Sequence, residues 1–576
     1  MALTWRERGV LALGLLLLTA LLAGLLVPPG AGAGPPSTTP STPLGTERVL
    51  RLGLQGPATT VDPLYAATPA ERDLAALLFR GLVRLGPGST VVGDLASSWE
   101  ISADGRTYTF HLRPDAQWLD GVPVTSGDVA FTVRTLQDPA YDGPNGASWQ
   151  NVSVETPDDA TVVLRLTDPA AGFLYAATQR IVPEHVLADL DITTLRASAF
   201  EIQPVSDGAF RLVSLDLQGA RLERLTAAPG QSPATSFDPL APLPQASAGA
   251  TDPASGLAQL PVIQVRFFET GAEMASALRG GQLDMAGGLD PEATAALAST
   301  SGFATLRYPQ AVLSAAILNV RSDQPLFRDV RVRQALLEAI DREAIVREAL
   351  GGAGSVATSP YPPATADLPA PSSPLPTYGP KGAAGLLTAA GWKRQADGWH
   401  RPAAKDPVTF EVVTVSEADN AALYAVAQRV VAAWTALGLK VTLSALKAGD
   451  LVQGRLLRHD FQAAVVDMNL GLDPDLMPLL TSSEARRGGS NLSGYQNVAL
   501  DRQLVAAHAY ADATVRGQRL AAVRTSFATQ LPFLPLVFAD RVEVFTTRLS
   551  GPSSRQLGSP SDRFWDVLAW RLAGAP

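Results

Sequence analysis

The chain has 576 residues, of which 46% are apolar and 18% charged, with a formal net charge of −9 and no cysteine. This apolar share is enough to bury a large core, so the composition excludes a chain that is disordered throughout. The lack of cysteine excludes disulfides, thiolate metal sites and cysteine nucleophiles. The acidic balance argues against a dedicated nucleic-acid binder, and the length predicts roughly two to four domains.

Residues 1–33 have the pattern of an export segment. Arg6 and Arg8 precede an uncharged, leucine-rich run at 9–27, and the small residues Ala31-Gly32-Ala33 follow it. This order is typical of a secretory signal, but the run is also long enough for a tilted transmembrane helix. Cleavage after Ala33 and retention as a membrane anchor both remain open. Either one places the rest of the chain in the periplasm or on the outer face of the cell membrane, after a Pro/Ser/Thr-rich linker at 34–45.

The first half of the remaining chain reads mainly as strands. Thr68-Pro69-Ala70-Glu71 is a capping box that starts a helix, and apolar residues alternate on both sides of two turn-forming segments, as in hairpins. Residues 82–190 are therefore predicted to form a mostly antiparallel unit. The expected elements are a strand at 49–54, a helix from 69 to about 80, hairpin strands near 99–101 and 108–112, a helix at 126–136, and hairpin strands at 152–155 and 161–166.

The later half has a different pattern. Residues 226–261 consist mostly of Ala, Pro, Ser, Gly and Thr and predict a loosely held loop, whereas 328–350 carry helical spacing, with Asp341 expected to cap a following short helix. Beyond residue 400 strands and helices alternate, which predicts a parallel sheet covered by helices, with ligands bound where the strands end. The expected order is a strand at 408–415, a helix at 417–437, a strand at 439–446, a helix near 450–458 and a strand at 461–466.

No catalytic motif is present. The sequence contains no G-x-S-x-G, no H-E-x-x-H and no G-x-x-x-x-G-K-[ST]. The five histidines show no metal-ligand spacing. We therefore expect no catalytic residue, no metal site and no cofactor.

A series of short motifs occurs in a characteristic order. Its most specific block runs from Gly93-Asp94-Leu95-Ala96-Ser97-Ser98-Trp99 to Asp120-Gly121, and Ile181-Val182-Pro183-Glu184-His185 follows later. Further motifs lie at 325–335, 389–392 and 491–495. In this order they resemble the extracellular solute-binding proteins of family 5, which are receptors of peptide- and nickel-type ABC importers.

The resemblance implies an α/β fold with two lobes, of the periplasmic-binding-protein-like type II. It would belong to the cluster of large members that carry an extra antiparallel subdomain in lobe one. Such lobes close on a ligand about crossing segments. The implied limits are 46–266 for lobe one, with the subdomain 82–190 and the loop 226–261; 267–529 for lobe two; and 530–576 for a return segment that completes lobe one.

The function implied by the resemblance is that of a receptor, not an enzyme. It would capture a peptide or similar small solute by hinge closure and deliver it to ABC permease subunits in the membrane, with no nucleic acid involved. The alternative is a membrane-anchored envelope enzyme, or a ligand sensor, derived from the same fold. Turnover of a candidate ligand by the purified protein would distinguish the enzyme from the receptor.

The site residues implied by the resemblance lie mainly in lobe two. Peptide binders of the family place an Asp against the α-ammonium of the ligand, and alignment on Asp473-Pro474-Asp475 puts Leu470 at that position. Leucine cannot form a charge-assisted bond to an ammonium, so a ligand with a free N-terminus is disfavoured. The candidate ligand-binding residues are Trp149, Asp467, Asn469, Asp473, Asn491 and Tyr495.

Overall fold

A computed structural model describes residues 48–86, 90–225, 258–362, 374–473, 475–509 and 513–573. The expected export segment at 1–33 and the linker at 34–45 lie outside these residues, as does most of the loop expected at 226–261. The last part of that expected loop differs from the prediction, because Ala258–Gln259 form strand β10, which pairs with β22 (Arg571–Leu572).

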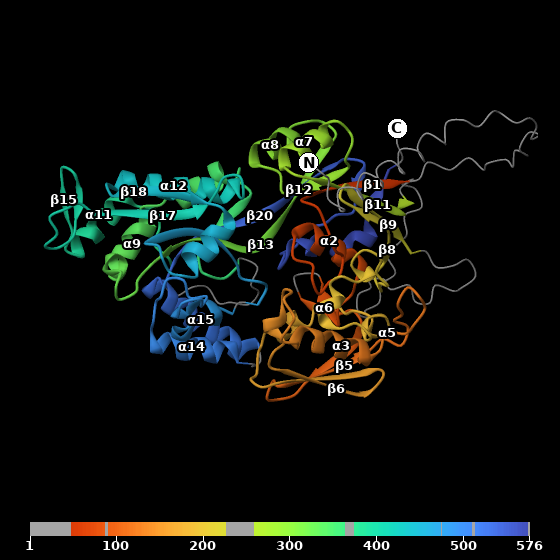
Figure 1. Cartoon of the computed structure of the whole chain (residues 1–576). Helices are drawn as coiled ribbons and strands as arrows, with labels where there is room; N and C mark the ends of the chain where they lie inside the picture. Colours follow the sequence, from red (N-terminus) through yellow and green to blue (C-terminus); the bar gives the residue numbers. More distant parts are fainter. Residues whose placement is uncertain are drawn as a thin grey trace, which may run out of the picture. The chain divides into compact units, whose positions relative to one another are not determined.

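One mixed sheet of 11 strands runs through the described part of the chain (Figure 1). Its strands, in spatial order, are β18 (Lys440–Leu446), β17 (Thr409–Val415), β19 (Ala463–Asn469), β13 (Phe303–Leu318), β20 (Leu534–Thr546), β12 (Met285–Gly287), β1 (Val49–Gln55), β11 (Val262–Phe268), β9 (Gly219–Arg224) and β8 (Phe210–Asp216), with β14 (Gly354–Val356) paired to β20.

The antiparallel unit is confirmed at the level of its elements. Strands β4 (Ala96–Ile101), β5 (Thr107–Leu112), β7 (Thr161–Leu166) and β6 (Val152–Asp158) form a four-stranded antiparallel sheet. Helix α2 (Pro69–Leu78) begins at the expected capping box between Thr68 and Glu71, and α3 (Ser126–Gln137) begins after Thr125.

The parallel sheet of the later half is confirmed only in part. Strand β17 pairs in parallel with β18 and β19, but β19 pairs antiparallel with β13. Helix α12 (Ala421–Leu437) begins four residues later than expected, because the side chain of Asn420 accepts from the Leu423 amide and caps it there. The helix expected near 450–458 is a π-helix at Asp450–Leu456.

The helical segment expected over 328–350 is present, with the new helix start expected at Asp341. It divides into α9 (Val330–Glu338), α10 (Arg342–Ala344) and a π-helix at Ile345–Ala349, because Asp341 caps a new helix start through the Ala344 amide. The other helices are α4 (Phe173–Ala176), α5 (Glu184–Leu187), α6 (Ile192–Leu195), α7 (Gly271–Arg279), α8 (Pro291–Ala298), α11 (Pro380–Ala389), α13 (Met477–Leu480), α14 (Val498–His508) and α15 (Ala513–Gln530), with 3-10 turns at Gly146–Ser148, Ala199–Glu201, Pro325–Phe327, Ser482–Ala485 and Pro560–Ala569. The remaining strands are β2 (Val83–Leu85), β3 (Val91–Gly93), β15 (Lys393–Gln395), β16 (Gly398–His400) and β21 (Leu549–Ser550).

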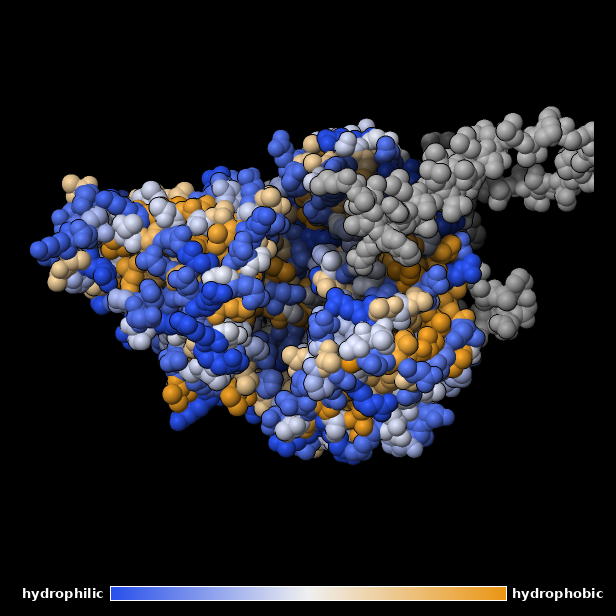
Figure 2. Space-filling view, in the orientation of Figure 1, coloured by the Kyte–Doolittle hydropathy of each residue, from blue (hydrophilic) through white to orange (hydrophobic). Residues whose placement is uncertain are grey.

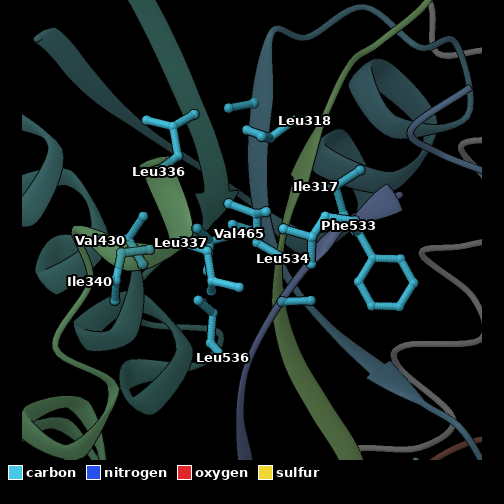
Figure 3. Close-up of a cluster of buried hydrophobic side chains, with 14 of the residues drawn as sticks. Ile317, Leu318, Leu336, Leu337, Ile340, Val430, Val465, Phe533, Leu534 and Leu536 are labelled. Carbon is cyan, nitrogen blue, oxygen red and sulfur yellow. The ribbon is translucent and has the colours of Figure 1, made fainter. Parts of the chain in front are cut away.

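Two large hydrophobic cores lie along this sheet. One gathers residues between Leu313 and Phe538, and Figure 3 shows its centre, with Leu336 and Val430 from helices beside Val465 and Leu534 from strands. The other joins the residues from Leu50 to Met285 with the segment from Leu549 to Leu572. A small third cluster includes Met274 and Val544.

Strands β13 and β20 connect these cores. Their pairing is continuous from Phe303 to Pro309, shifts register before Leu313, and then continues into the core between Leu313 and Phe538. The segment 271–303 packs with β1 and β20, not with the core of the later half. We therefore propose that the chain crosses between lobes at 309–313 and 538–540, instead of at the limits 266/267 and 529/530 drawn from the resemblance.

Polar and charged groups cover most of the face in Figure 2, and apolar groups form separate patches on it. None of the helices that the structure describes is both long enough and apolar enough to cross a membrane.

Candidate ligand-binding site

A cavity of about 530 Å³ lies where the two large cores approach each other. One wall comes from α2, the turn before it, and the segments 145–149 and 172–180. The other comes from the loop after β19 and from the residues that begin the 3-10 segment at Pro560–Ala569. The wall residues are Pro63, Ala66, Arg72, Ala75, Leu85, Asn145, Ser148, Trp149, Gly172, Tyr175, Ala176, Thr178, Gln179, Arg180, Gly471, Leu472, Gly558, Ser559, Ser561 and Asp562.

Arg180 is held in place on this wall by its backbone. A β-bridge joins it to Gly81, and the amide of Ile181 donates to the Arg80 carbonyl at 2.9 Å. Gly81 leaves no room for a side chain, because a Cβ there would lie 2.8 Å from the Thr178 carbonyl oxygen. The close approach of these two backbone segments therefore fixes where the Arg180 side chain starts.

The guanidinium of Arg180 has no partner among the described residues. Its Nε is buried without an acceptor, and its two terminal nitrogens form no hydrogen bond or ion pair. Burial lowers the pKa of Arg180, and the charges of Asp562 and Asp94 oppose that shift only partly. A guanidinium offers a planar fork of donors that matches a carboxylate, so this wall can bind an anionic group.

The other polar groups of the cavity are mostly engaged. Arg72 donates to the Ala67 carbonyl, and Asn145 donates to Gln179 at 3.1 Å. Asp562 is the carboxylate of this wall, and it accepts from the Gly558 and Ser559 amides. Burial raises the pKa of Asp562, which makes its ionised form less favourable. Arginine side chains therefore dominate the ionisable groups that a ligand would meet.

Two of the predicted site residues lie at or beside the cavity. Trp149 is on its wall, but the side chain is only 2% exposed and its ring packs edge-on against Phe173 at 5.7 Å. Asn469 lies beside the wall, where its amide donates to the Gly558 carbonyl at 3.4 Å and its Oδ1 accepts from Gly471. Both residues shape the cavity through the segments they hold.

Two predicted aspartates are bound to protein partners. Asp467 accepts from Ser314 Oγ at 2.6 Å and from Asn420 Nδ2 at 3.2 Å. Asp473 pairs with Arg516. Leu470 packs against the core of the later half and brings no carboxylate to the site.

The last two predicted residues lie elsewhere. Asn491 is fully buried, and its amide donates to the carbonyls of Leu480, Thr481 and Tyr495. Tyr495 lines a separate cavity of about 610 Å³ and donates to Gln530 at 3.0 Å. The structure therefore does not bring the six predicted residues together at one site.

Sequence reasoning missed Arg180, Gly172 and Tyr175. A signal was present, because Arg180 directly precedes the motif Ile181-Val182-Pro183-Glu184-His185. No three His, Asp or Glu side chains in the described ranges gather as a metal site would require.

The mixed sheet, the two cores and the cavity at their junction are features of two-lobed solute-binding proteins. Residues 90–489 match the family model described as bacterial extracellular solute-binding proteins, family 5 Middle. The chain belongs to this family, and the resemblance and the fold class drawn from the sequence are both confirmed.

Individual relatives agree with this assignment. A Brucella ovis protein whose name refers to ABC transporter peptide binding is 30% identical over 377 residues, which span 58% of this chain and 64% of that protein. The match thus covers less than two thirds of that relative's length. The oligopeptide-binding protein AppA of Bacillus subtilis is 25% identical over 533 residues, 91% of each chain.

Solved structures show the same fold. The structure of AppA with a nonapeptide has a TM-score of 0.70 at 22% identity, and covers 92% of this chain and 99% of its own. NikZ of Campylobacter jejuni in complex with Ni(L-His) has a TM-score of 0.71 at 23% identity, and covers 91% of this chain and 99% of its own.

Proposed function

We propose that the protein is the extracytoplasmic receptor of an ABC importer, and that it captures a small carboxylate-bearing solute in the 530 Å³ cavity and delivers it to membrane permease subunits. The observation that carries this proposal is the unpaired guanidinium of Arg180 on the cavity wall. The Nε of Arg180 is buried without an acceptor among the described residues, while the residue as a whole is half-buried, so a group that binds here and supplies a carboxylate gains a charge-assisted, two-point contact.

Closure about β13 and β20 would provide the capture mechanism. The register shift between Pro309 and Leu313 interrupts the pairing between the two large cores, and segments of both sides line the cavity. A ligand that touches both walls favours the closed state by its difference in affinity for the two states.

The solute class follows from the charges of the wall. Relatives are named for peptides and the NikZ structure holds a nickel–histidine complex, and all of these ligands carry carboxylates. The wall offers arginines, and the position where peptide binders hold an ammonium is Leu470. We therefore propose that the carboxylate end of the solute, whether a peptide or an amino-acid chelate, is its principal anchor.

The test uses the purified exported protein. Native mass spectrometry identifies any co-purifying solute, and calorimetry then measures its binding together with a panel of di- and tripeptides and Ni(L-His). Arg180→Gln should weaken binding about 100-fold, as expected for the loss of a buried charged contact. The control Arg224→Gln should bind normally, because Arg224 donates to the Leu568 carbonyl and does not line the 530 Å³ cavity.

Two outcomes would overturn the proposal. Equal binding by wild type and Arg180→Gln would remove Arg180 from the site. A change in the mass of the bound molecule on incubation would favour the enzyme alternative, because a receptor releases its cargo unaltered.

We also propose that residues 1–33 direct export and remain as a membrane anchor. Arg6, Arg8 and the apolar run at 9–27 carry this proposal. The mass of the protein recovered from the membrane fraction of its host tests it, since a mature chain that begins at Gly34 would show that the segment is cleaved.

A further inference from the structure

A second, smaller cavity adjoins the ligand cavity. Its volume is about 160 Å³, and five residues belong to the walls of both cavities: Leu85, Thr178, Arg180, Ser561 and Asp562. The smaller space has room for one small polar group and a few waters, but not for a whole peptide. Arg180 lies at the boundary and can reach both spaces.

The wall of the smaller cavity carries four arginines and two aspartates, in a chain whose net charge is −9. Arg80 pairs with Asp94 at 2.7 Å. Asp562 accepts from two backbone amides, and its charge acts on Arg180 and Arg555 without an ion pair to either among the described residues. Arg84 also interacts within the protein, so Arg180 and Arg555 are the two arginines of this wall that form no ion pair in the described part of the chain.

Arg555 is the second arginine with unused donors. The residue is only 7% exposed, and its Nη1 donates to the Leu85 carbonyl at 2.9 Å. The Nε and Nη2 groups have no acceptor among the described residues, and the guanidinium lies over the Trp565 ring at 5.3 Å from its centroid. A buried donor without an acceptor destabilises the fold, so Arg555 and Arg180 together leave several unmatched donors around one small space.

We propose that this smaller cavity is an oxyanion subsite, in which Arg555 and Arg180 bind a carboxylate or phosphate group. On the basis of the proposed receptor function, we infer that this group is one of two acidic groups of the solute. The other is a carboxylate that Arg180 binds in the larger cavity. The receptor then prefers solutes with two acidic groups a few bonds apart, such as peptides that end in Glu or Asp. A free small oxyanion, such as phosphate, would present the same acidic oxygens to this subsite.

The first experiment tests the subsite without any assumption about cargo. The melting temperature of the purified protein is followed in sodium phosphate against sodium chloride of equal ionic strength. The wild type and the Arg224→Gln control should show a saturable rise of several degrees, as expected for a ligand that binds only the folded state. Arg555→Gln should lose the rise. Should Arg555→Gln not fold, Arg555→Lys replaces it, because it keeps the charge but lacks the forked donors.

The second experiment identifies the source of the anion. Calorimetry compares the N-acetylated forms of Ala-Glu and Ala-Gln, which carry no α-ammonium and differ only in the second acidic group. Wild type and Arg224→Gln should bind Ala-Glu about tenfold more tightly, and the preference should disappear in Arg555→Gln while Ala-Gln still binds. Arg180→Gln should weaken both dipeptides.

The outcomes separate the two proposals. A phosphate response that depends on Arg555, without binding of either dipeptide, supports a free-oxyanion subsite and counts against the proposed cargo. Dipeptide binding that depends on Arg180, with no effect of Arg555 on phosphate or on the Ala-Glu preference, supports the receptor and overturns the subsite.

Discussion

The carboxylate of Asp473 occupies the space that a Cβ on Gly172 would need. The two residues approach from opposite sides of the ligand cavity, since Gly172 is on one wall and Gly471 and Leu472 are on the other. A backbone hydrogen bond from Ala171 to the His508 carbonyl, at 3.0 Å, lies beside this contact. The absence of a side chain at position 172 therefore allows the rim of the cavity to close.

Gly172→Ala should hinder that closure. The added Cβ overlaps Asp473, whose side chain cannot move freely because it pairs with Arg516. Overpacking of this kind costs about 1–3 kcal/mol, so affinity for the co-purifying solute should fall roughly tenfold, and small-angle scattering should give a larger radius of gyration. Gly385→Ala is a matched control, because open space surrounds a Cβ there. Wild-type affinity and compactness in Gly172→Ala would refute this prediction.

Asp62 should make stability depend on pH. Its side chain is fully buried, Oδ1 accepts from the Leu64 amide and Oδ2 has no donor. Burial raises the pKa of Asp62 to about 7, from an ordinary value of 3.8. The folded state therefore favours the protonated form, and the free energy of unfolding should fall as the pH rises from about 4 to 7.

Asp62→Asn should remove this dependence. Between pH 5 and pH 8 the wild type should lose about 2–3 kcal/mol more stability than the variant, measured by urea unfolding. The exposed Asp168→Asn serves as the control and should follow the wild type. A constant difference between wild type and Asp62→Asn across this range would contradict the assignment.

Asp73→Ala should strongly destabilise the fold. Arg563 is fully buried and donates to both Asp73 oxygens, at 2.8 and 2.6 Å, which ties helix α2 to the C-terminal segment. Burial alone would raise the pKa of Asp73, but the charge and hydrogen bonds of Arg563 outweigh it and lower that pKa. Removal of one partner of a buried pair costs about 3–5 kcal/mol.

Chemical denaturation measures this loss. The matched control is Glu155→Ala, which removes the exposed ion pair with Arg165 and should leave stability unchanged. A similarly small effect at Asp73 would mean that Glu543, 3.1 Å from Arg563 Nε, compensates for the lost partner.

Asn491→Ala separates a structural role from a binding role. Its side chain satisfies three carbonyls and accepts from Ser493 and Gly494, all inside the protein. The free energy of unfolding should fall by about 2–4 kcal/mol, because several buried groups lose partners, while the affinity of the folded variant for solute stays unchanged. Asn151→Ala, at an exposed position, is the control. Reduced solute affinity with normal stability would instead return Asn491 to the binding site.

Local signals explain which elements could be predicted. The capping box of Thr68 and Glu71 and the alternation in the hairpin strands near 99–101 and 108–112 depend on neighbours in sequence, and the elements appear where expected. The start of α12 was missed, because Asn420 outcompetes the apolar periodicity by capping a later helix start. The new helix start at Asp341 was expected and is present. The mixed sheet was also missed, since β13 and β20 pair over a sequence separation of more than 200 residues.

The candidate site was less predictable for the same reason. Asp467, Asn491 and Tyr495 have the chemistry of ligand contacts, but Ser314, the carbonyl of Leu480 and Gln530 occupy them in the fold. Arg180 and Arg555 are ordinary arginines in the sequence, separated by 375 positions. They matter because some of their guanidinium nitrogens have no hydrogen-bond acceptor among the described residues. This can be seen only in the three-dimensional structure.

The sequence by itself determined the family, the α/β class and most of the short elements, because motif order and local periodicity are properties of a linear chain. Tertiary structure decided where the chain crosses between its cores and which side chains remain free to bind. A polar group becomes a binding group only when folding leaves it without a partner beside a cavity, and that depends on every segment packed around it.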